Sequence, residues 1–201
     1  ILALDVSSTM LAQDFSPNRL EAAKKVAAEF INDRPNDKIG LVIFGGESFT
    51  QCPLTTDHRV LLNLLNEVRF GMIEDRTAIG MGLATSVNRL KNSQSKSRVV
   101  ILLTDGSNNA GQIAPLTAAE LAASYGIRVY TVGIGSRCNS IAQIGHQRLM
   151  VSCAFDERTL TEIASITGGS YLSATDHTSL LEISDDITDI DTYNIRLITV
   201  A

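Results

Sequence analysis

Residues 99–106, Val-Val-Ile-Leu-Leu-Thr-Asp-Gly, form a continuous apolar run that ends in polar residues. An apolar run of this length favours a buried strand. The start of the chain has the same form, because the apolar residues Ile1–Leu4 lead directly into Asp5 and a loop rich in hydroxyl groups. Strands that are apolar throughout are typical of parallel sheets with both faces covered. The two segments therefore predict two buried strands of such a sheet.

Strand and helix signals alternate along the rest of the chain. Further strands are predicted at residues 39–44, 48–51, 127–132 and 171–172. Apolar positions at helical spacing predict helices after residues 16–18 and after 57, and others near 79–90, 115–125, 156–166 and 180–190. The long irregular segment 134–154 is interpreted as a hairpin around His146. We therefore expect an α/β fold: a doubly wound, mostly parallel, Rossmann-like sheet with one short antiparallel edge strand and helices on both faces.

Composition places the chain among globular proteins. Its 201 residues suit a single domain, residues 1–201, and 44% hydrophobic with 19% charged residues argues against disorder. The 17 Lys and Arg residues are scattered, so no nucleic-acid footprint is visible. No apolar stretch is long enough to span a membrane, and the chain opens in a strand rather than at Met. We interpret the sequence as a domain excised from a longer protein.

The cysteines do not fix the redox compartment. Three cysteines are too few for a disulfide framework. The spacing allows Cys138 and Cys153 to pair across the base of a loop, whereas separate, partly buried thiols are favoured for these two and for Cys52.

Residues with oxygen-bearing side chains follow both buried strands and also precede one helix. Asp5 and Asp105 each come directly after a strand, and Thr77 leads into the helix that precedes the second strand. Ser7 and Thr9 alternate with Asp5, so the three side chains are expected to point the same way. In a doubly wound sheet, ligands bind beyond the carboxyl ends of the strands where the strand order reverses. If the two strands are neighbours, all three loops share one crevice.

Each of these pieces has an ordinary structural interpretation. Asp-Gly after a strand is a common turn, and Ser or Thr after a strand often caps a helix. Together, two carboxylates and three hydroxyls form the all-oxygen ligand set that a hard divalent cation prefers. We therefore predict a metal site at Asp5, Ser7, Thr9, Thr77 and Asp105.

These residues resemble the metal-ion-dependent adhesion site (MIDAS) of the von Willebrand factor type A (VWA) family. The matching motifs are Asp5-x-Ser7-x-Thr9, Thr77 and Thr104-Asp105-Gly106. Longer segments are similar to the BatA-like aerotolerance branch of that family, and they lie at residues 2–7, 14–22, 77–80, 102–106 and 166–171. The resemblance covers essentially the whole chain, and the fold that it implies is the doubly wound sheet expected above.

The resemblance also implies a role for each ligand. Ser7, Thr9 and Thr77 would contact the cation directly or through water, and Asp5 and Asp105 would hold it mainly through bound waters.

Three positions depart from the family pattern. Thr9 stands where Ser is usual, Arg76 where glycine is common and Met81 where a polar residue is common. Thr9 keeps the hydroxyl and adds a methyl group. Arg76 would either compete with the cation or help to attract a carboxylate.

Such a site suggests recognition rather than catalysis. Hydroxyls are neutral ligands, so a cation held with two carboxylates keeps positive charge and an open coordination position that a partner's Asp or Glu can complete. Mg²⁺ is the leading candidate because it keeps several waters and needs few protein ligands, with Mn²⁺ or Ca²⁺ possible. The expected function is divalent-metal-dependent protein–protein interaction, without enzymatic activity.

Two alternatives stay open. One is a Mg²⁺-dependent phosphatase-like hydrolase with Asp5 as nucleophile, although such enzymes need a second acid where Ser7 stands. The three histidines lie outside the site loops, and Gly133-Ile134-Gly135 is half a dinucleotide fingerprint that lacks its third glycine. The other alternative is a scaffold domain whose metal site is vestigial, with Arg76 in place of the ion.

Family resemblance further implies a cellular context. It points to a bacterial protein anchored in the inner membrane, with this domain on the periplasmic side, working beside other VWA proteins and a MoxR-type AAA ATPase. Neither membrane segments nor nucleic-acid contacts are expected within this chain. The tail at residues 193–200 is interpreted as an exposed strand that pairs with a sheet edge.

Overall fold

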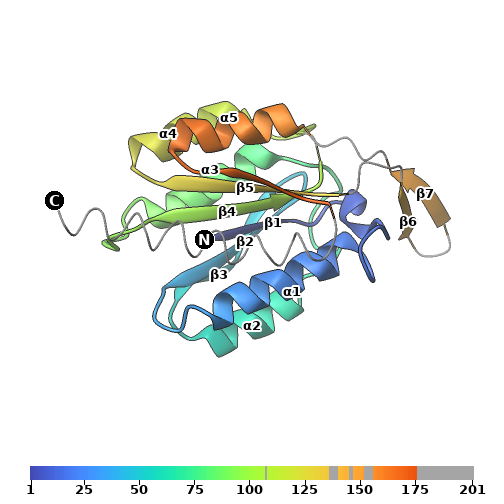
Figure 1. Cartoon of the computed structure of the whole chain (residues 1–201), viewed down its shortest axis with the longest axis horizontal. Coiled ribbons are helices and arrows are strands. Elements are labelled where there is room, and N and C mark those ends of the chain that lie inside the picture. The colour runs from blue at the N-terminus through green and yellow to red at the C-terminus, as the bar shows by residue number, and fades with distance from the viewer. Residues whose placement is uncertain (107, 136–139, 145–146, 152–155, 176–201) are drawn as a thin grey trace.

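A six-stranded sheet forms the centre of the protein. The computed structural model describes residues 1–106, 108–135, 140–144, 147–151 and 156–175. The strands run in the order β3-β2-β1-β4-β5-β8 (Figure 1). Their bounds are β1 Leu2–Asp5, β2 Ile39–Phe44, β3 Ser48–Thr55, β4 Val99–Thr104, β5 Arg128–Ile134 and β8 Tyr171–Ala174. Every pair is parallel except β2 with β3, which confirms the predicted α/β fold.

The strand order reverses between β1 and β4. These two strands pair in parallel, with Leu2 opposite Ile101 and Leu4 opposite Leu103. From β1 the chain continues outward to β2 and β3, and from β4 it continues outward to β5 and β8. Since ligands bind beyond the carboxyl ends of strands at such a reversal, the fold itself singles out the loops after β1 and β4.

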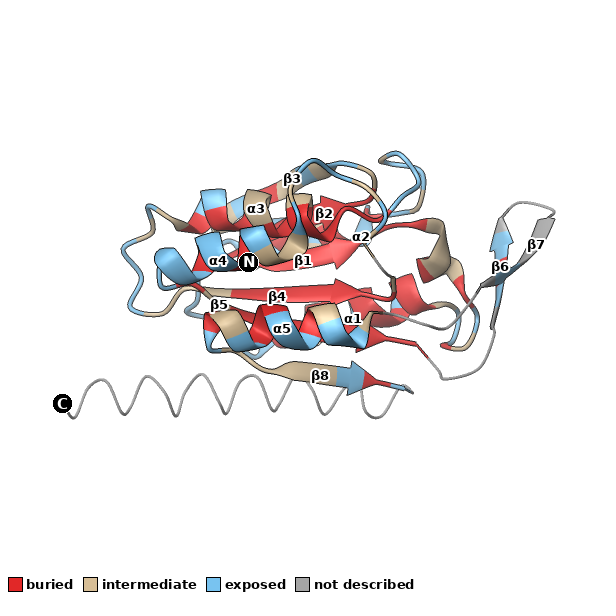
Figure 2. Ribbon diagram, turned by 90° about the horizontal axis from the view of Figure 1, so that it is seen from above, coloured by how far each residue is buried: buried red, intermediate tan, exposed pale blue. Residues whose placement is uncertain are grey.

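In the described part of the chain, five α-helices cover the two faces of the sheet. Helices α1 (Arg19–Asn32) and α2 (His58–Asn66) lie on one face, and α3 (Ile79–Leu90), α4 (Pro115–Ser124) and α5 (Glu157–Thr167) lie on the other (Figure 1). Alternate residues of β1 enter the two cores: Leu2 and Leu4 pack with α1 and α2, and Ala3 packs with α3 to α5. Both faces of the central strands are therefore buried, whereas the helices expose their outer sides (Figure 2).

Local signals fix where the helices begin and end. Asn18, Asp57 and Asp156 cap α1, α2 and α5, each accepting a hydrogen bond from the backbone N–H three residues later. Pro115 opens α4, where the missing N–H costs nothing. Gly168 ends α5 in the left-handed conformation, with φ of 71°.

The antiparallel edge strand is longer than its sequence indicates. The prediction placed it at residues 48–51, but β3 runs from Ser48 to Thr55 and contains Pro53. Only Cys52 of this strand is buried, so its apolar pattern is weak. An edge strand tolerates proline because one of its sides makes no ladder hydrogen bonds.

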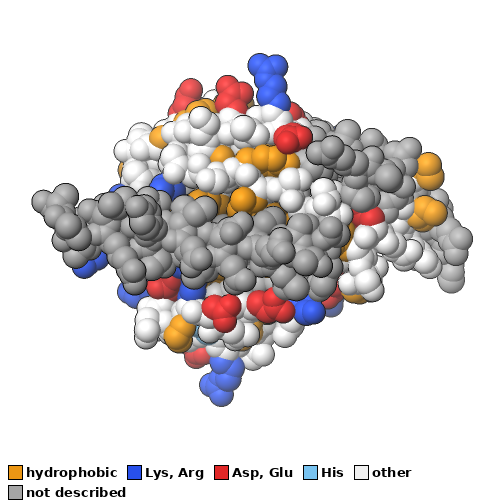
Figure 3. Space-filling model, viewed as in Figure 1, with side chains coloured by type: hydrophobic (Ala, Val, Ile, Leu, Met, Phe, Trp, Pro, Cys, Tyr) orange, Lys and Arg blue, Asp and Glu red, His pale blue; other side chains and the backbone are white. Residues whose placement is uncertain are grey.

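A second, two-stranded sheet stands at the carboxyl end of the main sheet. Strands β6 (Ser140–Ile144) and β7 (Gln147–Val151) pair antiparallel, which confirms the predicted hairpin. The backbone N–H of Gln13 donates to the carbonyl oxygen of Ile141 at 3.0 Å, so the hairpin is joined to the loop after β1. Ile141 and Met150 face each other across the hairpin with side chains exposed to solvent, and hydrophobic atoms are visible there in Figure 3.

Some predictions fall outside the described residues. These are the last helix near 180–190, the strand-like tail at 193–200, and the residues Cys138, Cys153, His146 and His177. Cys52 is a buried free thiol. No helix among the described residues is long and apolar enough to cross a membrane.

Candidate metal centre

Asp5 lies at the base of the site, where β1 ends. Its carboxylate is fully buried. Oδ1 accepts a hydrogen bond from the backbone N–H of Ser7 at 2.9 Å, and Oδ2 accepts one from the hydroxyl of Thr104 at 2.6 Å. Thr104 is the last residue of β4, so this hydrogen bond joins the ends of the two strands that flank the reversal. Both Asp5 oxygens are thus held by partners within the protein.

The loop after β1 brings two hydroxyls together. The chain turns into a short 3₁₀ helix, η1 (Ser8–Leu11). The turn places Ser7 Oγ 3.0 Å from Thr9 Oγ1, so these two side chains point toward the same place. The hydroxyl of Thr9 donates a hydrogen bond to Asp105 Oδ1 at 2.6 Å. Because Thr9 has no second proton, Ser7 is the donor to Thr9.

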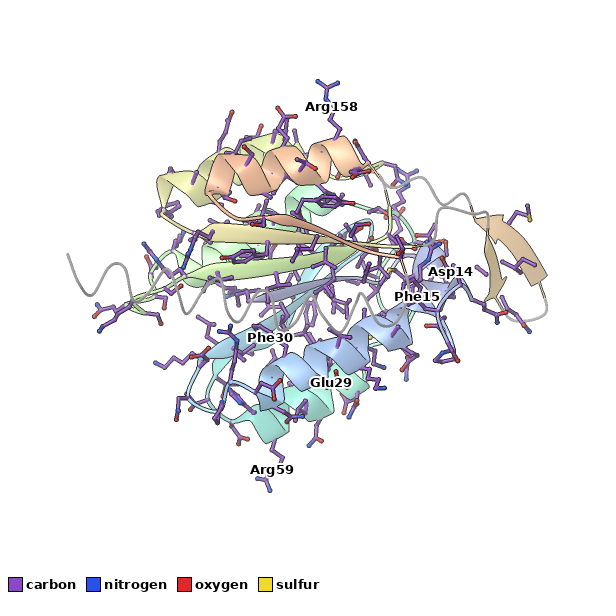
Figure 4. The ribbon with its side chains drawn as sticks, in the orientation of Figure 1. Asp14, Phe15, Glu29, Phe30, Arg59 and Arg158 are labelled. Carbon is purple, nitrogen blue, oxygen red and sulfur yellow. The ribbon has the colours of Figure 1, made fainter. Side chains whose placement is uncertain are left out.

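Asp105 is held from behind by a buried arginine. Its Oδ2 accepts a hydrogen bond from Arg19 Nη1 at 2.7 Å, and Arg19 is fully buried at the start of α1. The same guanidinium donates from Nε and Nη2 to the two carboxylate oxygens of Asp14, at 2.8 and 2.7 Å. Figure 4 shows Asp14 near the end of the sheet, on the side of the hairpin. Asp14, Arg19 and Asp105 therefore form a continuous chain of ion pairs.

Thr77 reaches the site from the loop before α3. Its backbone N–H donates to Asn109 Oδ1 at 2.9 Å, and its carbonyl oxygen accepts from the N–H of Asn109 at 2.9 Å. Gly106 lies close against it, since a Cβ at that position would be 3.2 Å from Thr77 Oγ1. The loops after β4 and before α3 are thus locked together, with the Thr77 side chain between them.

The hydroxyls meet in an open pocket of about 360 Å³. It is lined by residues of three loops: Ser7, Ser8, Thr9, Asp75, Arg76, Thr77 and Asn109. Asp75 stabilises the first loop, because its Oδ1 accepts the backbone N–H of Ser8 at 2.8 Å. The Arg76 side chain lies on the rim, 61% exposed, with Nε 3.8 Å from Glu74. Arg19 does not line the pocket.

The comparison with known families identifies the domain. Residues 1–108, more than half of the chain, match the von Willebrand factor type A domain. The chain belongs to the von Willebrand factor type A family. An uncharacterized protein of Borreliella burgdorferi is 31% identical over 187 residues, which are 88% of this chain and 53% of that protein. The VWA chain spans about half the length of the curated relatives that it matches.

Solved structures with a similar fold come from bacteria and from mussel byssus. BatB from Bacteroides thetaiotaomicron is 28% identical with a TM-score of 0.84, over 95% of this chain and 97% of that one. An aerotolerance-related membrane protein from Bacteroides fragilis is 28% identical with a TM-score of 0.81, over 92% and 95% of the two chains. The mussel byssus protein PTMP1, solved with zinc in its MIDAS motif, shares the fold at 22% identity and a TM-score of 0.71, over 94% of this chain and 45% of its own.

The buried carboxylates of the VWA domain have unusual acidity. Burial and the neighbouring Asp105 raise the pKa of Asp5 to about 7. Burial also raises the pKa of Asp105, although the positive charge and hydrogen bond of Arg19 oppose the shift. For Arg19, burial lowers the pKa, but the bonds to Asp14 and Asp105 outweigh it and raise the pKa above its ordinary value.

The donor set fits a hard cation. Within the described ranges, no group of three or more His, Cys, Asp or Glu is placed to hold a metal ion. The pocket is lined by the hydroxyl residues Ser7, Ser8, Thr9 and Thr77 together with Asp75, Arg76 and Asn109, and the carboxylates of Asp5 and Asp105 behind them accept hydrogen bonds. A hard cation at this position would have oxygen ligands, most of them neutral hydroxyls, and an open side for bound waters, as Mg²⁺ prefers.

Several residues around the site were not predicted from the sequence. Thr104 anchors Asp5, Asp75 and Asn109 fix the loops, and Asp14 with Arg19 backs Asp105. The available signal was the position of Asp14 and Arg19 inside the segment 14–22 that resembles the family.

Proposed function

We propose that the chain is a protein–protein interaction module that works through a bound divalent cation. The family match and the aerotolerance-related structural neighbours support a VWA-type interaction module. The observation that carries the metal dependence is the open pocket lined by the hydroxyls of Ser7, Thr9 and Thr77, with Asp5 and Asp105 held behind it. Mg²⁺ is the proposed ion, with Mn²⁺ or Ca²⁺ as possible substitutes.

The charge of the site selects an acidic partner. Asp5 and Asp105 behind the pocket supply −2 when ionised, and Arg19 supplies +1 but is also paired with Asp14. Asp75 and Arg76, which line the pocket, carry opposite charges. A divalent cation whose nearest ligands are neutral hydroxyls keeps positive charge at the pocket. Because the pocket is open, a carboxylate from a partner's Asp or Glu can complete the coordination shell and neutralise the excess charge. Arg76 on the rim adds a second, solvent-exposed positive charge.

The hydrolase alternative has less support. Asp5 would have to act as a nucleophile, but its carboxylate is fully buried and both oxygens accept hydrogen bonds. His58, the histidine that the described part of the chain contains, lies elsewhere, with Nε2 2.8 Å from the carbonyl oxygen of Asp37. A VWA interaction module without catalysis is therefore the better interpretation.

The proposed setting is the bacterial cell envelope. The Bacteroides fragilis neighbour is an aerotolerance-related membrane protein, which supports membrane association. Segments outside this chain would supply the anchor and leave the domain on the periplasmic side. Other VWA proteins and a MoxR-type AAA ATPase are the partners that the family resemblance suggests.

Calorimetric titration with Mg²⁺ tests the metal site. Thr77→Val removes one hydroxyl and keeps the shape, so it should weaken Mg²⁺ binding about tenfold or more while the domain stays folded. The matched control is Thr131→Val, since Thr131 is also buried but donates to the carbonyl oxygen of Leu160. Equal Mg²⁺ affinity in both variants would refute the ligand assignment.

A second measurement tests the use of the cation. A partner recovered from native membranes should bind the wild-type domain in Mg²⁺ and be released by EDTA. Retention in EDTA contradicts a metal bridge. Hydrolysis of an aryl phosphate that needs Mg²⁺ and is abolished by Asp5→Asn would instead favour the hydrolase.

A further inference from the structure

Arg19 is an unusual residue to find inside this domain. Arginines such as Arg59 and Arg158 extend away from the molecule in Figure 4, whereas Arg19 is fully buried. Three of its donor nitrogens are bonded to carboxylates at 2.7 to 2.8 Å, one to Asp105 and two to Asp14. Buried ion pairs cost much desolvation and add little to stability compared with apolar side chains. Stability alone is therefore a weak reason for an arginine at this position.

The end of strand β5 leaves room for this guanidinium. A Cβ at Gly135 would lie 3.2 Å from Arg19 Cζ and 3.3 to 3.4 Å from Nη2 and Nη1. Gly133 and Gly135 resembled half of a dinucleotide fingerprint. Gly135 instead provides space for the Arg19 guanidinium, because it has no side chain there. The guanidinium packs between Asp14, Asp105 and this strand end, away from the metal pocket.

We propose that Arg19 is a positioning residue that sets the cation affinity of the site through Asp105. This inference rests on the proposed function. Arg19 donates a hydrogen bond to Oδ2 of Asp105, which leaves Oδ1 to accept the hydrogen bond from the Thr9 hydroxyl. Its positive charge lies against Asp105 and is shared with Asp14. Arg19 does not line the pocket, so it leaves the pocket open to the cation rather than taking the cation's place.

Arg19 thereby exchanges metal affinity for partner affinity. Without it, Asp5 and Asp105 are both uncompensated and a divalent cation is bound more tightly. A more strongly anionic site would leave the cation less positive charge for a partner's carboxylate, whereas Arg19 lowers the negative charge behind the pocket and leaves the cation more.

Two substitutions should shift cation affinity in opposite directions. Arg19→Met removes the positive charge and should tighten Mn²⁺ binding about tenfold. Asp14→Asn removes a negative charge from the far side of Arg19, leaves its charge to act on Asp105 alone, and should weaken Mn²⁺ binding severalfold. Arg19→Lys keeps the charge and should return the affinity to within a factor of about three of wild type.

Lys24→Met is the matched control. Lys24 is a buried cation on the same helix, but its Nζ contacts Glu21 and the carbonyl oxygens of Asn66 and Val68, not the site. Free Mn²⁺ measured by electron paramagnetic resonance gives the affinity of each folded variant. Lys24→Met should bind Mn²⁺ as wild type does, whatever its effect on stability.

The Mn²⁺ affinities of these variants test both the role of Arg19 and the proposed metal site. If Arg19→Met and Asp14→Asn both weaken Mn²⁺ binding, or neither changes it, Arg19 is only structural and the inference is overturned. If Arg19→Met does not fold, the direction of change in Asp14→Asn and Arg19→Lys decides the same point. If wild type binds no Mn²⁺ but Arg19→Met does, the proposed function fails while Arg19 still controls affinity. If no variant binds Mn²⁺, both proposals fail.

Discussion

The buried carboxylate of Asp5 should make the stability of the metal-free domain depend on pH. Its pKa is raised from the ordinary value of 3.8 to about 7, by burial first and by Asp105 second. The folded state therefore binds this proton more tightly than the unfolded state. The resulting stabilisation is complete below the unfolded pKa and is lost as the pH rises through the folded pKa. In the absence of metal, the domain should become less stable from mildly acidic to mildly alkaline pH.

The size of the effect follows from proton linkage. Between the two pKa values, the free energy of unfolding falls by about 1.4 kcal/mol per pH unit. From about pH 5 to the folded pKa this amounts to roughly 3 kcal/mol, and little more is lost by about pH 8. Mg²⁺ should oppose the trend, because the cation favours the ionised carboxylate and so stabilises the domain most at alkaline pH.

Urea unfolding in EDTA at several pH values measures the effect, with Asp5→Asn as control. The amide mimics the protonated acid and does not titrate, so the difference in stability between wild type and Asp5→Asn isolates this group. Between about pH 5 and pH 8, wild type should lose roughly 3 kcal/mol of stability relative to Asp5→Asn. A constant difference over this range would refute the assignment of a raised pKa to Asp5. Equal stabilisation by Mg²⁺ in wild type and Asp5→Asn would refute its role in metal binding.

Three further predictions concern the scaffold. Asp156→Ala removes the cap that accepts the Thr159 N–H, and should lower the free energy of unfolding by about 1 kcal/mol in urea titrations at neutral pH. Hydrogen bonds from Thr159 lower the pKa of Asp156, so this loss should persist as the pH falls and disappear only in acid below its ordinary value. Gly168→Ala should cost about 1 kcal/mol in the same assay, since φ is 71° although the space is open. Gly80→Ala should cost more, roughly 3 kcal/mol, because its Cβ would lie 2.0 Å from the carbonyl oxygen of Ile113; a melting temperature equal to wild type would contradict this.

The fold was accessible from the sequence because its main signals are local. Continuous apolar runs mark strands buried on both faces, and capping residues such as Asn18 and Asp57 mark helix starts within a few residues. The edge strand β3 was underestimated because it is half exposed and lacks a clear period. The 3₁₀ helix at Ser8–Leu11 was not predicted, because so short a turn leaves no apolar periodicity to detect.

The site was only partly predictable from the sequence, because local signals indicate some of its residues and not others. Its five candidate residues follow strands or enter a helix, so the topology of the sheet was enough to bring them together. The Arg19–Asp105 ion pair joins residues 86 positions apart. Arg19 at a helix start has the appearance of an ordinary solvent-facing residue, and nothing in its neighbours indicates burial. The pairing of Arg19 with Asp14 and Asp105 depends on how α1 packs against the ends of β4 and β5.

The proposed site links its two ligands by charge. Arg19 reduces the negative charge that Asp5 and Asp105 place behind the pocket, so a bound divalent cation keeps positive charge that a partner's carboxylate can neutralise. By thermodynamic linkage, the partner must then raise the affinity for the cation by the same factor as the cation raises the affinity for the partner. A site without Arg19 would neutralise more of the cation's charge by itself and lose part of that coupling. Among the described residues, Arg19 is thus the group that makes a metal site of this composition suited to reversible docking rather than to permanent metal retention.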